Sequence, residues 1–140
     1  MVCTFFGHKD TDIRIKERLK EVLTDLIVNH QADLFYVGNQ GNFDGIVRAT
    51  LKELKPDFPH VRYYVVLAYM PKDKLFDDDE TIYPEDLETV PPRYAIDKRN
   101  RWLISKADTL ITYVTHPFGG AARYKELAKK KGKHVIELSI

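Results

Sequence analysis

Two adjacent glycines, Gly119 and Gly120, separate an apolar stretch from a run of helical character. The stretch at 109–114 is rich in β-branched residues and predicts a buried strand. A helical pattern opens directly at Ala121, so the glycines lie where the backbone N–H groups of a helix N-terminus have no intrahelical acceptor. Such a terminus attracts phosphate and other anions. The arrangement therefore predicts contact between a phosphate-bearing ligand and Gly119, Gly120 and Ala121.

A second polar loop follows the apolar run at 34–37 and contains Gly38, Asn39, Gln40 and Gly41. Backbone N–H groups and amide side chains are suited to binding sugar hydroxyls or the edges of bases. Asp44 falls in the first turn of the helix expected after this loop. It either accepts a hydrogen bond from a ribose hydroxyl or complements the positive end of the helix dipole.

Histidines follow the first and the fourth predicted strands. Gly7 permits a tight turn after the first strand, and the adjacent His8 either contacts a phosphate or base or belongs to a plain turn. His116 lies in the loop before the glycine pair, where it is either a ligand contact or an ordinary loop residue. Gly7, His8 and His116 are candidate binding residues because ligands bind parallel sheets at the carboxyl ends of their strands.

Two arginines, Arg99 and Arg101, lie in the helix expected before the fourth strand. Arginine pairs with phosphate or carboxylate through two parallel hydrogen bonds. Successive residues of a helix point about 100° apart, so the two side chains cannot share one direction. The apolar residues nearby favour Arg99 as the inward one, whereas a solvated helix face is the alternative for both.

These candidate residues are positioned by strands that alternate with helices. The expected strands are 2–6, 34–37, 61–68, 109–114 and 135–138, and the expected helices are 13–30, 42–54, 93–106 and 120–131. Such alternation predicts βαβ units with right-handed crossovers and helices on both faces of the sheet. The fold class is therefore α/β, with residues 1–140 forming a single Rossmann-like, three-layer domain whose mainly parallel sheet has about five strands.

Residues 70–92 interrupt this alternation with an acidic run at 77–80 and four prolines. They predict a long, mostly irregular loop with one short turn of helix. A loop of this length in a compact domain is usually functional or disordered. The sequence leaves open whether it covers the ligand or contacts another subunit.

The overall charge and the cysteine content exclude several classes of protein. Lysine and arginine total 22 against 21 acidic residues, so the net charge of +1 gives no argument for nucleic-acid binding. No apolar run approaches the ~20 residues of a membrane-spanning helix. The single cysteine, Cys3, is expected in the core and fits the reducing environment of the cytoplasm.

Sequence motifs for common catalytic centres do not occur. The histidines and Cys3 lack the spacing of metal ligands such as HExxH or CxxC, so no metal is expected. The first strand is not followed by GxGxxG, and no GxSxG motif is present, so a standard dinucleotide dehydrogenase is not expected either. No other cofactor is expected.

Four segments together resemble the SLOG superfamily, in particular small bacterial and phage proteins: 5–9, 35–44, 99–102 and 119–122. The resemblance covers nearly the whole chain and implies a SLOG-like Rossmann domain. The superfamily is associated with nucleotides and nucleotide-derived ligands. It includes the DNA-uptake protein DprA, the LONELY GUY phosphoribohydrolases and sensors in antiviral systems. The resemblance thus implies a nucleotide-derived small molecule as partner, self-association into homo-oligomers and a role in bacterial or phage defence.

The LONELY GUY enzymes cleave the N-glycosidic bond of a nucleoside monophosphate with an arginine and a glutamate. By resemblance, Arg99 and Glu126 match these two catalytic residues. The chain departs from the family's Pro-Gly-Gly-x-Gly-Thr motif, because Phe118 replaces the proline, Ala122 the next glycine and Arg123 the threonine.

Three readings of function follow from these observations. The first is a sensor or sequestering module that binds a nucleotide or nucleotide-derived molecule at the carboxyl edge of the sheet. The second is a nucleoside-monophosphate N-glycosidase that uses Glu126 and Arg99. The third is a DNA-processing accessory protein. The altered glycine motif favours holding a nucleotide over cleaving one, and whether the protein is an enzyme stays open.

Overall fold

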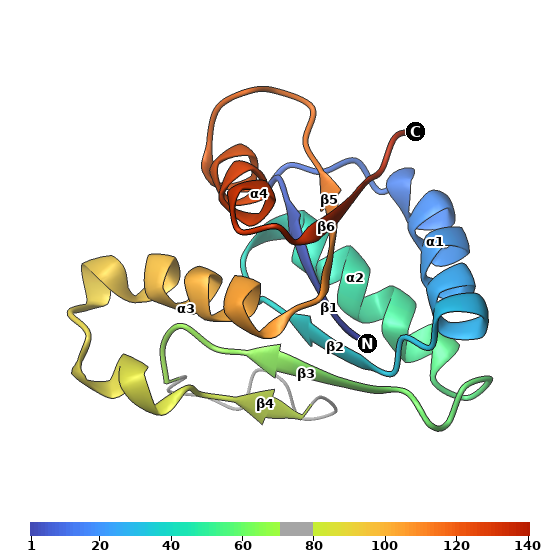
Figure 1. The fold of residues 1–140 in the computed structure, drawn as a ribbon, viewed down its shortest axis with the longest axis horizontal. Helices are drawn as coiled ribbons and strands as arrows, with labels where there is room; N and C mark the ends of the chain where they lie inside the picture. Colours follow the sequence, from blue (N-terminus) through green and yellow to red (C-terminus); the bar gives the residue numbers. More distant parts are fainter. Residues whose placement is uncertain (71–79) are drawn as a thin grey trace.

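A computed structural model describes residues 1–70 and 80–140. Its centre is one sheet of six parallel strands in the order β4-β3-β2-β1-β5-β6 (Figure 1). The strands are β1 (Val2–Gly7), β2 (Leu34–Val37), β3 (Arg62–Val66), β4 (Thr81–Ile82), β5 (Thr109–Tyr113) and β6 (His134–Glu137). The helices are α1 (Ile15–His30), α2 (Gly41–Leu54), α3 (Pro92–Lys106) and α4 (Gly120–Lys130), with a 3-10 helix, η1, at Glu85–Thr89. The predicted α/β class and parallel sheet are confirmed.

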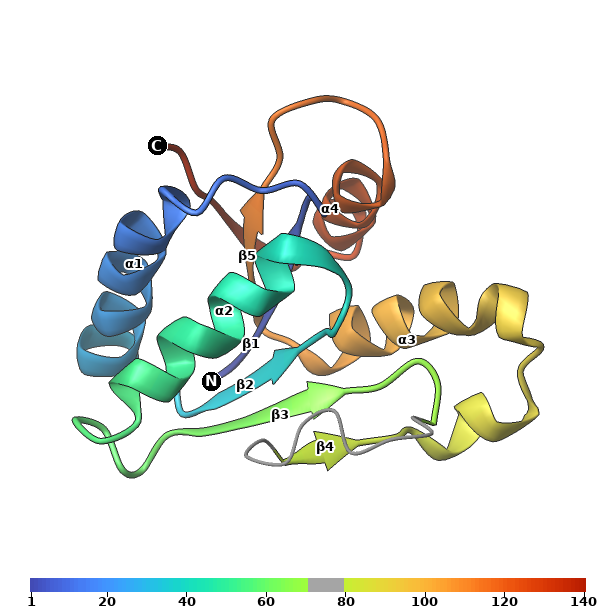
Figure 2. The same cartoon turned by 180° about the vertical axis from the view of Figure 1, so that it is seen from behind.

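The sheet lies between two pairs of helices, α1 with α2 and α3 with α4 (Figure 1, Figure 2). Alternate residues of β1 point to opposite faces, as the period of a strand requires. Phe5 packs in the cluster formed with α1 and α2, and Phe6 packs in the cluster formed with α3 and α4. Both faces of β1 are therefore buried, which explains why its sequence is a continuous apolar run.

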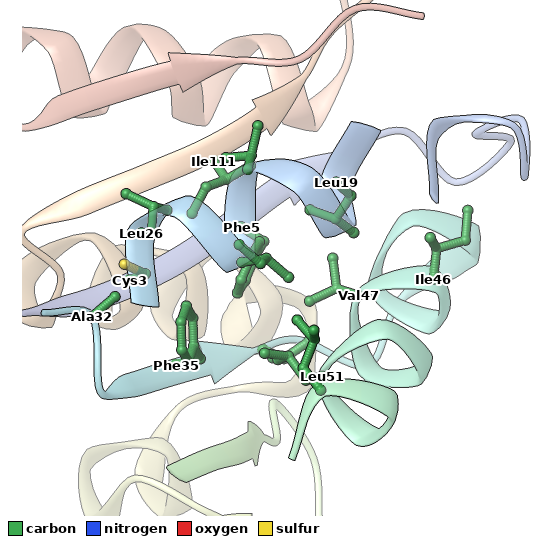
Figure 3. Packing of buried hydrophobic residues seen from close by; sticks show 14 of the residues in the cluster. Cys3, Phe5, Leu19, Leu26, Ala32, Phe35, Ile46, Val47, Leu51 and Ile111 are labelled. Carbon is green, nitrogen blue, oxygen red and sulfur yellow. The ribbon is translucent and has the colours of Figure 1, made fainter. Parts of the chain in front are cut away.

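The larger core cluster joins β1, β2 and β5 to α1 and α2 (Figure 3). Phe5 and Phe35 stack with their ring centroids 6.1 Å apart. Cys3 is fully buried in this cluster, and burial raises the pKa of its thiol to about 12. The thiol is therefore protonated at neutral pH and packs as a small apolar side chain, as its sequence context predicts.

The region 70–92 contains more regular structure than the sequence predicts. The two residues of β4 extend the sheet beyond β3, where Val65 N–H donates to Glu80 O at 2.9 Å and Leu67 N–H to Ile82 O at 2.8 Å. A strand of two residues is too short to show alternation, so sequence patterning does not detect it. The helix η1 matches the single helical turn expected in this region, whereas most of the acidic run at 77–80 lies outside the described residues.

The order of the strands along the sheet changes direction at β1: β2, β3 and β4 are added on one side of it, and β5 and β6 on the other. Strand β1 lies between β2 on one side and β5 on the other, and Cys3 pairs with both Phe35 and Thr109. The connections that leave the carboxyl ends of β1, β2 and β5 therefore meet at this switch point. In open α/β sheets this is where ligands bind.

Candidate functional site

A cleft of about 1200 Å³ opens at the carboxyl ends of β1, β2 and β5. It is bounded by the loop after β1, the start of α2, the middle of α3 and the start of α4. Most of the residues predicted from sequence line it: Gly7, His8, Gly38, Gln40, Asp44, Arg99, His116, Gly119, Gly120, Ala121 and Glu126. Asn39 and Gly41 do not line the cleft. Asn39 instead contacts Arg99, and Gly41 packs against the backbone of Lys9.

Gly7 and Gly38 are required by packing at the ends of their strands. A Cβ atom on Gly7 would lie 2.2 Å from Cγ of Phe43, and one on Gly38 would lie 2.6 Å from Oδ2 of Asp44. Both distances are far inside van der Waals contact. The two glycines thus allow the first turn of α2 to dock directly on β1 and β2, which brings Asp44 to the wall of the cleft.

The N-terminus of α4 points its free amides at the cleft. Gly119 has φ +91°, a left-handed conformation that favours glycine, and no side chain caps the helix. Arg123 N–H donates to Gly119 O at 3.1 Å. In the described part of the chain, the preceding N–H groups of Gly120, Ala121 and Ala122 have no acceptor. All three residues line the cleft, so an anion bound there would receive these hydrogen bonds.

Arg99 is the inward arginine of α3, as predicted, with only 2% of its surface exposed. Its Nη1 donates to Val66 O at 2.9 Å and to Asn39 Oδ1 at 3.1 Å, and its Nε donates to Asn100 Oδ1 at 2.8 Å. Desolvation lowers the pKa of the guanidinium, but arginine stays charged at any physiological pH. Arg99 thus joins α3 to the ends of β2 and β3 and places a positive charge in the cleft wall.

Asp44 is a buried carboxylate in the same wall, 9% exposed. Its Oδ2 accepts a hydrogen bond from Gln40 N–H at 2.9 Å. Burial raises the pKa of this carboxyl to about 6, and the Gln40 hydrogen bond and the charges of Arg99 and Arg48 offset part of that rise. The group therefore changes protonation state close to neutral pH.

Three aromatic rings form a column at the mouth of the cleft, which we call the ring column: His8, His116 and Phe118. The rings of His8 and His116 stack with centroids 3.7 Å apart and planes 20° apart. The rings of His116 and Phe118 stack at 4.1 Å and 24°. Nε2 of His8 accepts a hydrogen bond from Thr115 N–H at 3.0 Å, which ties the loop after β5 to the loop after β1.

The His8–Thr115 hydrogen bond requires a neutral His8, because a backbone N–H can only donate. Burial lowers the pKa of His8, as does the neighbouring His116, against a smaller opposing effect of Asp10. The unfolded chain therefore binds a proton more readily, and stability is lost as the pH falls below about 6.5.

We expect His8→Gln, which keeps an acceptor but cannot be protonated, to reduce the slope of unfolding free energy against pH. Urea unfolding at pH 7.5, 6.5 and 5.5 measures this slope. Replacing the exposed His30 by glutamine is the matched control, and an equal change of slope in both variants would contradict the role given to His8.

Comparisons with known proteins relate this chain to a solved structure by its fold, and to no family by its sequence. No protein-family model matches the chain, and no curated protein matches its sequence. The fold is similar to that in the X-ray structure of DNA processing protein A (DprA) from Streptococcus pneumoniae, with a TM-score of 0.68 and 13% identity. The alignment covers 96% of this chain and 49% of that one, so the chain spans about half the length of DprA. At this identity the likeness concerns the fold alone.

Glu126, the candidate catalytic glutamate of the hydrolase reading, lines the cleft but is largely exposed to solvent. Its side chain is 65% exposed, and its Oε1 lies 4.0 Å from Nζ of Lys129. Asp44, in contrast, is buried in the cleft wall beside Arg99. Asp44 is therefore much more shielded from solvent than Glu126.

The sequence analysis missed two buried polar residues of the cleft, Asn100 and Tyr124. Asn100 accepts the hydrogen bond from Arg99 Nε. Tyr124 stacks on Phe6 with centroids 5.4 Å apart and donates its hydroxyl to Asp97 Oδ1 at 2.6 Å. Tyr124 lies one helical turn after Gly120, so its spacing from the glycine pair is the signal that points to it.

The described residues contain neither a candidate metal site nor a helix that could span a membrane. Residues 1–70 and 80–140 contain no group of three or more histidine, cysteine, aspartate or glutamate side chains arranged to hold a metal ion. Within the same ranges, every helix is too short or too polar to cross a membrane.

Proposed function

We propose that the cleft binds a nucleotide or nucleotide-derived small molecule, and that the protein acts as a sensor or sequestering module for it. The observation that carries the proposal is the start of α4, where the uncapped amides of Gly120, Ala121 and Ala122 line a cleft of about 1200 Å³. A phosphate group is the natural ligand of such amides. A cleft of this volume accommodates a whole nucleotide.

The remaining cleft residues supply what the rest of a nucleotide requires. Arg99 places a positive charge in the wall, which favours an anionic ligand. Asp44 offers a carboxylate to ribose hydroxyls or to the N–H groups of a base. Gln40 adds an amide side chain at the same wall. Phosphate, sugar and base would thus each find a complementary group within one cleft.

Binding without cleavage is supported by the position of Glu126. An acid–base or charge-stabilising carboxylate in a glycosidase must lie within hydrogen-bond reach of the reacting group. Glu126 is largely exposed to solvent and lies near Lys129. The segment after Gly120 also lacks the glycine and threonine that the hydrolases carry in their motif. The N-glycosidase reading with Glu126 and Arg99 is therefore the second candidate. Self-association, a cytoplasmic location and a role in defence stay predictions.

Thermal unfolding with AMP, NAD and cyclic nucleotides tests the proposal directly. A ligand at 100 times its dissociation constant stabilises the protein by about 2.7 kcal/mol, which a melting curve resolves. Chromatography of the same mixtures then distinguishes binding from cleavage. Recovery of intact nucleotide supports a binding module, whereas release of free base that Glu126→Gln abolishes would establish the hydrolase. No shift with any nucleotide at millimolar concentration would exclude both.

Gly120→Val is expected to abolish the nucleotide-induced shift in melting temperature while leaving the unliganded protein folded. The nearest atom to a Cβ at this position is Tyr124 Cε2 at 3.9 Å, so the fold has room, yet the side chain would cover the α4 amides. Gly45→Val is the matched control, because its Cβ also has 3.9 Å of space, to Arg48, and Gly45 lies outside the cleft. A shift that survives Gly120→Val would put the ligand elsewhere.

A further inference from the structure

The ring column ends in an exposed aromatic face. Phe118 lines the cleft and is 69% exposed. His116 covers one face of its ring. Nδ1 of His116 also lies 2.9 Å from Phe118 O, which fixes the backbone of the turn. One face of the phenyl ring is thus held in place, and the structure leaves the outer face without a stacking partner among the described residues.

The column is anchored at its inner end as well. His8 is buried, accepts the Thr115 N–H and stacks on His116, so the three rings are supported from the loop after β1. A rigid aromatic surface binds another flat ring with little loss of conformational entropy. The centroid distances of 3.7 Å and 4.1 Å leave no space for another ring inside the column, so a further flat ring can stack only on its outer end, at Phe118.

The end of the column is close to the amides of α4. Phe118 precedes Gly120 by two residues, and consecutive Cα atoms are 3.8 Å apart, so their Cα atoms are separated by about 7.6 Å at most. Phe118 and the amides of Gly120 and Ala121 thus belong to one short segment that lines the cleft, so one ligand can contact both.

We propose that Phe118 binds the base of the ligand by stacking, with His116 and His8 as its rigid support. The inference rests on the proposed function and narrows it: the ligand carries a nucleobase, and a sugar phosphate without a base is a poor substitute. The aromatic ring, rather than a hydrogen-bonding side chain, supplies this contact, so several bases are accepted.

Calorimetric titration of AMP, GMP, CMP and UMP, with ribose 5-phosphate as the baseless match, tests this inference. Loss of a base–aromatic stack weakens binding roughly 5- to 150-fold. We expect Phe118→Ala and Phe118→Leu to lose this factor for the nucleotides and to bind ribose 5-phosphate as wild type does. Phe118→Trp should retain nucleotide binding. Tyr94→Ala removes another exposed aromatic ring, 53% exposed and outside the cleft, and should change nothing.

The outcomes separate this inference from the proposed function. If Phe118→Ala binds the nucleotides as tightly as wild type does, and ribose 5-phosphate likewise, the stacking proposal is wrong and the phosphate site stands. Equal losses for both ligands would mean that Phe118 only shapes the loop, which also overturns stacking. If none of the mononucleotides binds but single-stranded oligothymidine does, and needs Phe118, the base comes from nucleic acid and the small-molecule function fails. If no probe binds, both proposals are wrong.

Discussion

Arg99→Met is expected to lower the free energy of unfolding by about 3 kcal/mol at pH 7.5. The substitution fills much of the same volume but removes the guanidinium N–H groups that donate to Val66 O, Asn39 Oδ1 and Asn100 Oδ1. Val66 O and Asn100 Oδ1 lose this donor in a buried region, whereas Asn39 Oδ1 keeps the hydrogen bond from Gln40 Nε2 at 3.4 Å. The positive charge that offsets the burial of Asp44 is lost as well. Urea unfolding followed by circular dichroism measures the change.

Arg101→Met is the matched control, two residues along the same helix. Arg101 is exposed and pairs with Asp97 at 3.0 Å one turn away, and exposed pairs of this kind contribute about 0.5 kcal/mol. Because both variants replace an arginine by methionine, the difference between their losses of unfolding free energy measures the effect of burial. Similar small losses in both would mean that the buried hydrogen bonds of Arg99 contribute no net stability.

Asp44→Asn is expected to raise the free energy of unfolding at pH 7.5 by about 2–3 kcal/mol. Folding raises the pKa of Asp44 from 3.8 to about 6, so the folded protein binds the extra proton more tightly than the unfolded chain does. Stability from this group is complete below pH ~4 and is lost as the pH rises through about 6. Asparagine is neutral at every pH and retains an oxygen for the Gln40 N–H.

The advantage of Asp44→Asn should therefore shrink towards zero at pH 4, which urea unfolding at the two pH values tests. Asp10→Asn is the control, since Asp10 is an exposed carboxylate at the rim of the same cleft. A variant that is less stable than wild type at both pH values would contradict the assignment. A buried carboxylate that costs stability at neutral pH is typical of a functional position, so the stabilised variant should bind nucleotide more weakly.

The sequence predicted the sheet well because buried parallel strands are continuous apolar runs. β1, β2 and β5 each stand out in this way, and a proline or glycine follows the ends of α2 and α4. The sequence did not indicate β4, because two residues show no strand pattern of their own and this strand is defined by its pairing with β3. Whether residues 1–140 form one domain stays a prediction from length and pattern.

The candidate site was predictable where chain-local signals exist, as at the glycine pair before α4. The reason for Gly7 was not, because the contact that requires it comes from Phe43 on a helix 36 residues away. The ring column was equally hidden, since His8 and His116 come from loops over 100 residues apart. Arg99 was identified as inward, but its hydrogen bonds to the ends of β2 and β3 depend on how α3 packs.

The central position of β1 has a kinetic consequence. Cys3 to Gly7 pair with Thr109 to Tyr113, so the two strands that border the cleft are joined by more than 100 residues of intervening chain. Closing so long a loop costs entropy before any contact repays it, and an all-parallel sheet has no hairpin to start from. We therefore expect the cleft to form late in folding. A ligand of the cleft would then bind only to chains in which the sheet is complete. Binding at the cleft would therefore indicate that the whole domain is folded.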